Sequence, residues 1–254
     1  MIKNWVGFST LSGREIKRFF SVWRQTVVPG VVTTLLYIFI FGVALENRIS
    51  TISDIPYKIY ILPGLIMMNV ITNSVANSAS SLLQMKLLQT LPELMITPLS
   101  STEMSLSFIL GGTVRGTVNG VLILLICVLS GMPLVNPLLT VGIIVIVAWI
   151  FSALGLIIGQ VADSWDQLAV IQNFIITPLS FLGGIFYSIY MLPDWAIRIS
   201  LLNPIYYSIN SLRAATIGVE EFSLFGSIMI IIGCNILLSS VAIMLMNTGY
   251  RIRS

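Results

Sequence analysis

Six long apolar stretches follow one another along the chain, separated by shorter polar or proline-containing segments. The stretch from Leu138 to Gly159 contains no charged residue at all. Continuous apolar runs of about 18 residues or more can cross the hydrocarbon core of a bilayer as helices. The pattern therefore predicts six membrane spans, at residues 27–45, 59–81, 104–130, 138–161, 168–187 and 224–247.

Hydrogen bonding decides which kind of span these runs form. In lipid, every backbone N–H and C=O must be paired within the protein, so only helices and closed β-barrels cross. A barrel strand would alternate apolar and polar residues, whereas these runs are continuously apolar. Only 9% of the residues are charged and 56% are hydrophobic, against about 25% charged in soluble domains. We therefore expect an all-α polytopic membrane protein, with residues 1–254 forming one transmembrane domain.

The first 26 residues precede the first span and mix aromatic with basic side chains. Such a mixture suits the headgroup region, so residues 1–26 are expected to form an amphipathic helix at the membrane interface. Lysine and arginine are more frequent in cytoplasmic loops. One side of the membrane would hold Lys3, Arg14, Lys17, Arg18, Arg24, Lys86, Arg251 and Arg253; the other would hold Arg48, Lys58, Arg198 and Arg213. This distribution predicts that both termini are cytoplasmic.

Two apolar segments are too interrupted to be simple spans. Residues 86–101, on the cytoplasmic side, contain Pro92 and Pro98. Residues 187–218, on the outer side, contain Pro193 and Pro204 together with several aromatic rings. Non-helical backbone is tolerated at membrane depth where protein buries it, so the second segment is expected to form a re-entrant hairpin before the last span.

Small and polar residues within the spans suggest how the helices meet. Residues at four-residue spacing share one face of a helix. Glycines in the third and fourth spans, Gly112, Gly116, Gly120, Gly155 and Gly159, have this spacing and predict close helix packing. In the second span, Asn69, Asn73 and Asn77 form a polar stripe that either hydrogen-bonds across an interface or lines a pathway.

Arg115 lies well inside the third span, with Asn119 one turn further on. An arginine at the centre of a span costs roughly 2.5–3.5 kcal/mol on insertion scales, so it needs a partner or water. Two interpretations stay open. Arg115 either contacts an anionic substrate group, or it is a structural residue bonded to helix carbonyls or reaching a water-filled cavity.

Several chemistries are excluded by the residues themselves. The sequence has no GxxxxGK[ST] phosphate-binding loop, so P-loop hydrolysis of ATP within this chain is not expected. It has no histidine, which removes His-ligated metal sites and Ser-His-Asp triads. We expect no catalytic residue, no metal ion and no cofactor in this chain, and no nucleic-acid partner.

Three stretches resemble the permease subunit of ABC-2 type transporters, and the resemblance covers nearly the whole chain. The first is Pro63–Met68 at the start of the second span, and the second is Leu91–Pro98. The third begins with Leu192-Pro193, continues through Asn203-Pro204 and ends near Arg213. The resemblance is to small bacterial six-span permeases, including the group related to the nodulation-factor exporter.

This resemblance implies an exporter in the bacterial inner membrane. Two permease copies, surrounded by lipid, would pair with two copies of a separate ABC ATP-binding subunit, which would hold ATP and Mg. The interfacial helix and the coupling residues Leu91, Pro92, Glu93, Leu94 and Pro98 would dock onto that subunit. The substrate would be amphipathic or lipid-linked and would move outward.

Other functions remain open from the residues alone. A gradient-driven secondary carrier predicts dependence on a proton or sodium gradient, and a channel predicts passive conductance. A scaffold protein predicts no transport. The absence of a carboxylate at the middle of any span disfavours a proton-coupled carrier.

Overall fold

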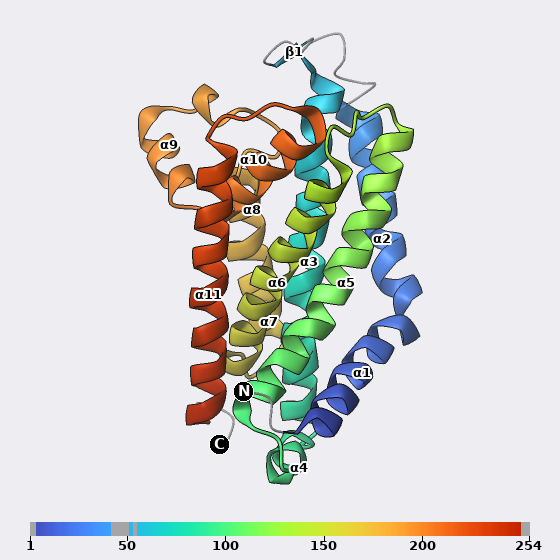
Figure 1. Ribbon diagram of the computed structural model, residues 1–254, viewed down its shortest axis with the longest axis vertical. Helices are drawn as coiled ribbons and strands as arrows, with labels where there is room; N and C mark the ends of the chain where they lie inside the picture. The colour runs from blue at the N-terminus through green and yellow to red at the C-terminus, as the bar shows by residue number, and fades with distance from the viewer. Residues whose placement is uncertain (1–3, 42–50, 53–54, 250–254) are drawn as a thin grey trace.

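The protein is described here by a computed structural model that covers residues 4–41, 51–52 and 55–249. These residues form an all-α bundle with one small antiparallel β ladder at one end (Figure 1). The longer helices are α1 (Trp5–Ser21), α2 (Trp23–Phe39), α3 (Tyr57–Leu87), α5 (Ser101–Leu129), α6 (Pro137–Val161) and α11 (Leu224–Thr248). The shorter elements are β1 (Thr51–Ile52), β2 (Ile55–Pro56), α4 (Leu91–Ile96), α7 (Trp165–Ile171), the π-helix η2 (Gln172–Ile176), α8 (Thr177–Leu182), the 3₁₀-helix η3 (Ile189–Met191), α9 (Asp194–Leu201) and α10 (Pro204–Ile217).

Four helices of the described chain, α3, α5, α6 and α11, are long and apolar enough to cross a membrane. The count rises to five if α1 and α2, which are bent by 59° relative to each other, form one span. The all-α prediction is therefore confirmed, whereas the prediction of six spans is not. Helices α5, α6 and α11 match the predicted spans 104–130, 138–161 and 224–247 to within three residues.

The predicted fifth span, residues 168–187, ends too late. Helical backbone runs through α7, η2 and α8 but stops at Leu182. Gly183 caps α8, and Gly184 has a φ of +79°, a left-handed conformation that glycine adopts at little cost. The glycine pair therefore turns the chain out of the helix five residues before the predicted end.

The boundary between the interfacial helix and the first span also differs from the prediction. The helix breaks at Val22, whose φ of −115° and ψ of 20° leave the helical region, so Trp23–Phe39 already belongs to α2. The predicted interfacial helix therefore ends before residue 26. Residues 1–3 and the end of the predicted span, 42–45, lie outside the described residues, as do Arg48, Arg251 and Arg253.

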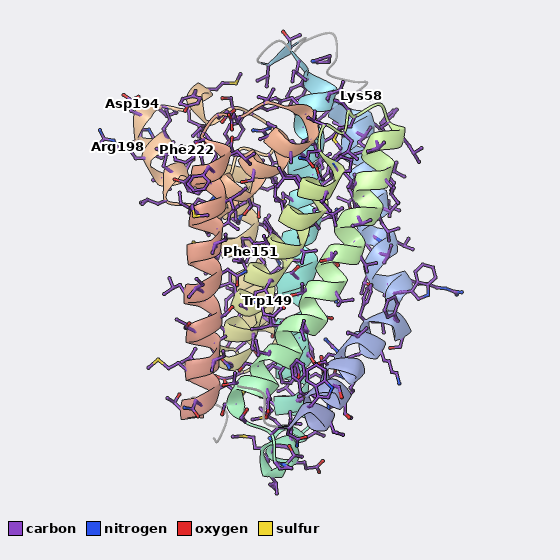
Figure 2. The ribbon with its side chains drawn as sticks, in the orientation of Figure 1. Lys58, Trp149, Phe151, Asp194, Arg198 and Phe222 are labelled. Atoms are coloured by element: carbon purple, nitrogen blue, oxygen red, sulfur yellow. The ribbon has the colours of Figure 1, made fainter. Side chains whose placement is uncertain are left out.

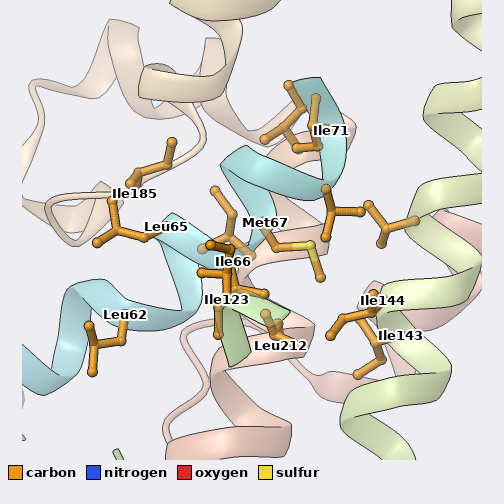
Figure 3. Close-up of a cluster of buried hydrophobic side chains, with 14 of the residues drawn as sticks. Leu62, Leu65, Ile66, Met67, Ile71, Ile123, Ile143, Ile144, Ile185 and Leu212 are labelled. Carbon is orange, nitrogen blue, oxygen red and sulfur yellow. The ribbon is translucent and has the colours of Figure 1, made fainter. Parts of the chain in front are cut away.

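Helix α3 is the centre of the bundle, between α5 and α6, and is the most buried of the four spanning helices. Its apolar side chains form the main core (Figure 3), where Leu65, Ile66 and Met67 pack with Ile144 of α6 and Leu212 of α10. Helix α11 lies at the periphery and is the least buried. Polar groups on α3 can therefore be reached only where neighbouring helices leave space.

The glycines of α5 bring it close to side chains of both α3 and α6. A Cβ on Gly112 would clash with Ser78 and Ser152, and one on Gly116 would clash with Ser74. A Cβ on Gly120 would lie 2.9 Å from Ile144 and would also meet Val70. In lipid the hydrophobic effect does not drive helices together, so close van der Waals packing is a main source of their attraction.

The glycines of α6 lie directly against the α3 backbone. A Cβ on Gly155 would be 2.8 Å from the Cα of Val75, and one on Gly159 would be 2.8 Å from the carbonyl oxygen of Ala79. The structure thus places both predicted glycine rows at contacts within this chain, and these contacts fix α3 against α5 and α6.

The segment predicted as a re-entrant hairpin, residues 187–218, contains the helices α9 and α10. Helix α9 projects outward from the bundle (Figure 1), whereas α10 is mostly buried and packs on α3, α6 and α11. The segment is therefore a helix pair attached to the bundle. Its insertion into the outer leaflet stays a prediction.

Candidate functional site

A cavity of about 300 Å³ lies between α2, α3 and η2. More than half of its lining residues are polar: Gln25, Thr26, Thr33, Thr34, Asn69, Thr72, Asn73, Arg115 and Gln172. Of the helices that line it, α3 and α5, which contributes Arg115, are apolar and long enough to cross a membrane. A polar cavity at such a place can receive a polar group that lipid would exclude.

Amides from the predicted stripe form a chain of hydrogen bonds in this cavity. Asn69 donates from Nδ2 to Thr34 Oγ1 of α2 at 3.1 Å, which links α2 to α3. Asn73 donates from Nδ2 to the carbonyl oxygen of Asn69 at 3.0 Å. Its own Oδ1 accepts from Arg115 Nε at 3.2 Å. The stripe therefore hydrogen-bonds across an interface, and two of its asparagines line a cavity. That it lines a transport pathway stays a prediction.

Two other predicted residues take different positions. Asn77 lies one turn from Asn73 and accepts from Arg18 Nη2 at both its backbone oxygen (2.8 Å) and its side chain (3.2 Å). Asn119 is buried and donates to the carbonyl oxygen of Arg115 at 2.9 Å, within its own helix. Neither residue lines the cavity. Gln172 does, which places the π-helical segment opposite the asparagines.

The sequence analysis missed Glu15, a fully buried carboxylate on α1. Its Oε2 accepts from Ser81 Oγ of α3 at 2.5 Å, and its Oε1 lies 2.9 Å from Arg14 Nη2. Arg18 Nε is 3.5 Å from Oε2, and a Cβ on Gly111 of α5 would lie 2.6 Å from the Cβ of Glu15. The available signal was one carboxylate among the basic residues of an amphipathic helix. Glu15 fastens α1 to α3 and α5.

The predicted coupling residues lie at the end of the bundle occupied by α4 and the start of α1 (Figure 1). Leu91 is buried and anchors α4, whereas Pro92 and Glu93 are exposed. Leu94 and Pro98 line a mostly apolar groove of about 520 Å³ that α1 completes. This end of the protein therefore offers an exposed carboxylate beside an apolar groove.

The start of α5 connects the first residues of α1 to the segment that follows α4. Ser100 and Glu103 form a capping box, in which Glu103 Oε2 accepts from the Ser100 backbone at 2.8 Å. The other carboxylate oxygen of Glu103 accepts from the Asn4 backbone N–H at 2.8 Å. Asn4 also donates to the carbonyl oxygen of Pro98 at 3.3 Å. The spacing of Ser100 and Glu103 was a readable signal that the sequence analysis did not use.

The residues of the predicted external signature begin the two hairpin helices. Leu192 and Pro193 directly precede α9. Asn203 caps α10 by accepting from the Ile205 N–H at 3.1 Å, and it donates to the carbonyl oxygen of Leu179 at 2.6 Å. Pro204 is the first residue of α10, a position where its missing N–H costs nothing. These residues shape the hairpin rather than forming a pocket.

Arg213, the last signature residue, is buried at the opposite end of the bundle from α4. It donates to the carbonyl oxygen of Gly184 at 2.8 Å, and its guanidinium lies 3.9 Å from the centre of the Tyr60 ring. Glu221 Oε1 is 3.7 Å away and accepts from Tyr60 Oη at 2.5 Å. Burial lowers the pKa of Arg213, while Tyr60 and Glu221 oppose that shift. The cluster locks the hairpin onto α3, and Tyr60 and Glu221 were not identified from the sequence.

The comparisons with known proteins agree with this architecture. The family model for the ABC-2 type transporter matches residues 6–217. The inner membrane transport permease YadH of Escherichia coli K12 is 36% identical over 232 residues, which cover 90% of this chain and 91% of that protein. Nodulation protein J of Sinorhizobium fredii is 21% identical over 205 residues, 78% of each chain.

The resemblance inferred from the sequence is thereby confirmed. The family model spans most of the chain, and the similarity to YadH extends along nearly its whole length. The chain is an integral membrane protein and belongs to the family of ABC-2 type transporter permeases.

Proposed function

We propose that this permease subunit forms the membrane path of an ATP-driven exporter for an amphipathic or lipid-linked substrate. The observation that carries the proposal is the half-open polar cavity between the helices, with Arg115 and two asparagines in its wall. Arg115 has no carboxylate partner among the described residues. A buried polar site of this kind is costly in lipid and is a candidate for substrate contact.

The proposal includes six membrane crossings, by α2, α3, α5, α6, the helical run from α7 to α8, and α11. The run from Trp165 to Leu182 would be about 27 Å long as a regular helix, close to the roughly 30 Å of the hydrocarbon core. Lys58 and Arg198 lie at the end opposite α4 (Figure 2), whereas Lys86 ends α3 on the side of α4. This distribution supports a cytoplasmic location for both termini in a bacterial inner membrane.

The energy source in this proposal is a separate ABC ATP-binding subunit, present in two copies and holding ATP and Mg. Permeases of this family generally work with such a subunit, and the exposed Glu93 beside the α1–α4 groove suits its docking. A second copy of the permease would complete the membrane part. ATP-driven closure of the two ATPase copies would then move the permeases relative to each other.

The test is a pull-down of the tagged protein from gently solubilised membranes, followed by an ATPase assay. We expect a co-purifying protein with a phosphate-binding loop and vanadate-sensitive hydrolysis of ATP. A permease that comes out alone, or an intact assembly without ATPase activity, would contradict the proposal. Gradient-driven flux or passive conductance in liposomes would then distinguish a secondary carrier from a channel.

A further inference from the structure

One face of α3 carries Asn69, Asn73, Asn77 and Ser81 at intervals of four residues, and we call it the α3 polar face. Because residues four apart lie above one another on a helix, this face forms a continuous strip. The strip is about 18 Å long at 1.5 Å per residue. It extends from the 300 Å³ cavity at Arg115 toward the end of the bundle where α1 lies.

Successive turns of the α3 polar face meet cationic side chains. Arg115 contacts Asn73, and Arg18 contacts Asn77 one turn further along. At Ser81 a second cavity, of about 420 Å³, opens beside α1. Its charged lining residues are Arg14, Glu15, Lys17 and Arg18. Two cavities with cationic walls therefore lie along one polar strip.

Positive charge is in surplus along this strip. Four cations and one carboxylate line the two cavities, and that carboxylate, Glu15, is already engaged by Arg14, Arg18 and Ser81. Lys17 and Arg115 form no ion pair with any described residue. An anion in either cavity would be attracted by this surplus of positive charge.

The geometry of Arg115 suits an oxyanion. Its Nε donates to Asn73, while no described residue accepts from its two terminal nitrogens. A guanidinium with free terminal N–H groups can grip a phosphate or carboxylate with two parallel hydrogen bonds. Because the surplus on the strip exceeds one charge, a phosphate monoester, which carries more than one negative charge near neutral pH, fits better than a carboxylate or a phosphodiester.

Two of the elements that line the Arg115 cavity, α2 and η2, also carry exposed apolar side chains. Leu36 on α2 and Phe174 on η2 are both exposed to the surroundings of the bundle, by 55% and 76%. A molecule with its charged group at Arg115 could keep hydrocarbon against these residues and in the lipid beyond them. This combination of a cationic polar floor and apolar edges is suited to an amphipathic molecule more than to a free soluble anion.

We propose that the substrate is an amphipathic molecule with a terminal phosphate, a monoester rather than the diester of phosphatidylcholine, which passes the cavity beside α1 and binds at Arg115. The inference rests on the proposed function, since it names the substrate class of that same path. Arg18 lines the cavity beside α1 and bonds to Asn77, one turn of α3 from Asn73 in the wall of the other cavity. Glu15 holds Arg14 and Arg18 along this route.

The test uses the purified permease–ATPase complex in mild detergent and radiolabelled dioctanoyl phosphatidic acid as the probe. We expect saturable binding that neither dioctanoyl phosphatidylcholine nor inorganic phosphate displaces at the same concentration. Arg115→Gln should weaken binding about tenfold or more, the loss typical of a charge-assisted hydrogen bond. The exposed Arg198, at the far end of the bundle (Figure 2), provides the control Arg198→Gln, which should bind like the wild type.

Equal displacement by phosphatidylcholine, or unchanged affinity in Arg115→Gln, would overturn the inference. Displacement by inorganic phosphate would assign the cavity to a free anion and overturn its amphipathic part. If Arg115→Gln does not fold, the wild-type competition still decides, and Arg115→Lys should bind with intermediate affinity. Because ATP hydrolysis is measured first on the same complex, an active ATPase without selective lipid binding would refute only this inference.

Discussion

Replacing Gly155 with alanine adds one methyl group where α6 comes closest to α3. The new Cβ would lie 2.8 Å from the Cα of Val75 and 3.0 Å from its carbonyl carbon. Non-bonded carbon atoms settle at about 3.5–4.0 Å. Since the obstacle is backbone rather than the end of a flexible side chain, the two helices must separate by roughly 1 Å.

The expected cost follows from two opposing terms. Forcing an extra carbon into a packed site costs about 1–3 kcal/mol, whereas alanine gains about 0.8–1.0 kcal/mol over glycine as a helix former. Gly142→Ala isolates the second term, because Gly142 lies on the same helix and a Cβ there meets nothing within 4 Å. The free energies of unfolding of the two variants should therefore differ by about 1–3 kcal/mol.

Thermal unfolding in detergent, followed by the monodisperse fraction on size exclusion, measures this difference. We expect Gly142→Ala to unfold at or above the wild-type temperature and Gly155→Ala to unfold several degrees below it. Gly159→Ala, which meets the Ala79 backbone in the same way, should behave like Gly155→Ala. If Gly155→Ala were as stable as Gly142→Ala, the direct contact of α6 with the α3 backbone would be refuted.

Three further substitutions test the other clusters. Glu93→Lys should uncouple ATP hydrolysis from transport in the purified complex, whereas Asp194→Lys, at the opposite end of the bundle, should not; equal effects would contradict docking at α4. Glu15→Gln should lower the unfolding free energy by about 1 kcal/mol, since its arginine partners are partly exposed, and 1 M salt should shrink the loss. Arg213→Met should lower the unfolding free energy by about 3–5 kcal/mol, because it leaves Glu221 buried without its cation. Adding Glu221→Gln should restore part of that stability in thermal unfolding; if it restored none, the two residues would not be coupled.

The long helices were predictable because lipid selects for them directly. An uninterrupted apolar run must be helical to pair its backbone groups, so α5, α6 and α11 could be placed closely from the sequence. Helix α3 was predicted to end at residue 81 but continues to Leu87, since its last turns are held by burial of Leu82 and Leu83. The helical run that begins at α7 ends at Leu182 because of the backbone conformation of Gly183 and Gly184. A hydropathy pattern carries no information about that conformation.

The candidate site was predictable only as far as one helix determines it. Four-residue spacing placed Asn69 and Asn73 on one face, and the cost of a charge in lipid singled out Arg115. Hydrogen bonds between segments that are distant in the sequence have no comparable sequence signal. Glu15 and Ser81 are 66 residues apart, and Tyr60 and Glu221 are 161 apart, so their partners could not be inferred from local pattern.

The capping box at the start of α5 gives this helix the properties of a lever. Glu103 joins α5 to the first residues of α1, beside the exposed α4, and Arg115 projects from the same uninterrupted helix. They are twelve positions apart, which corresponds to about 18 Å along the helix. A tilt of only about 5° imposed at the α4 end would displace Arg115 by about 1.5 Å, because the displacement grows with the length of the rigid helix. That is enough to break its 3.2 Å hydrogen bond to Asn73, so a small movement at the α4 surface would change the geometry of the binding site proposed at Arg115.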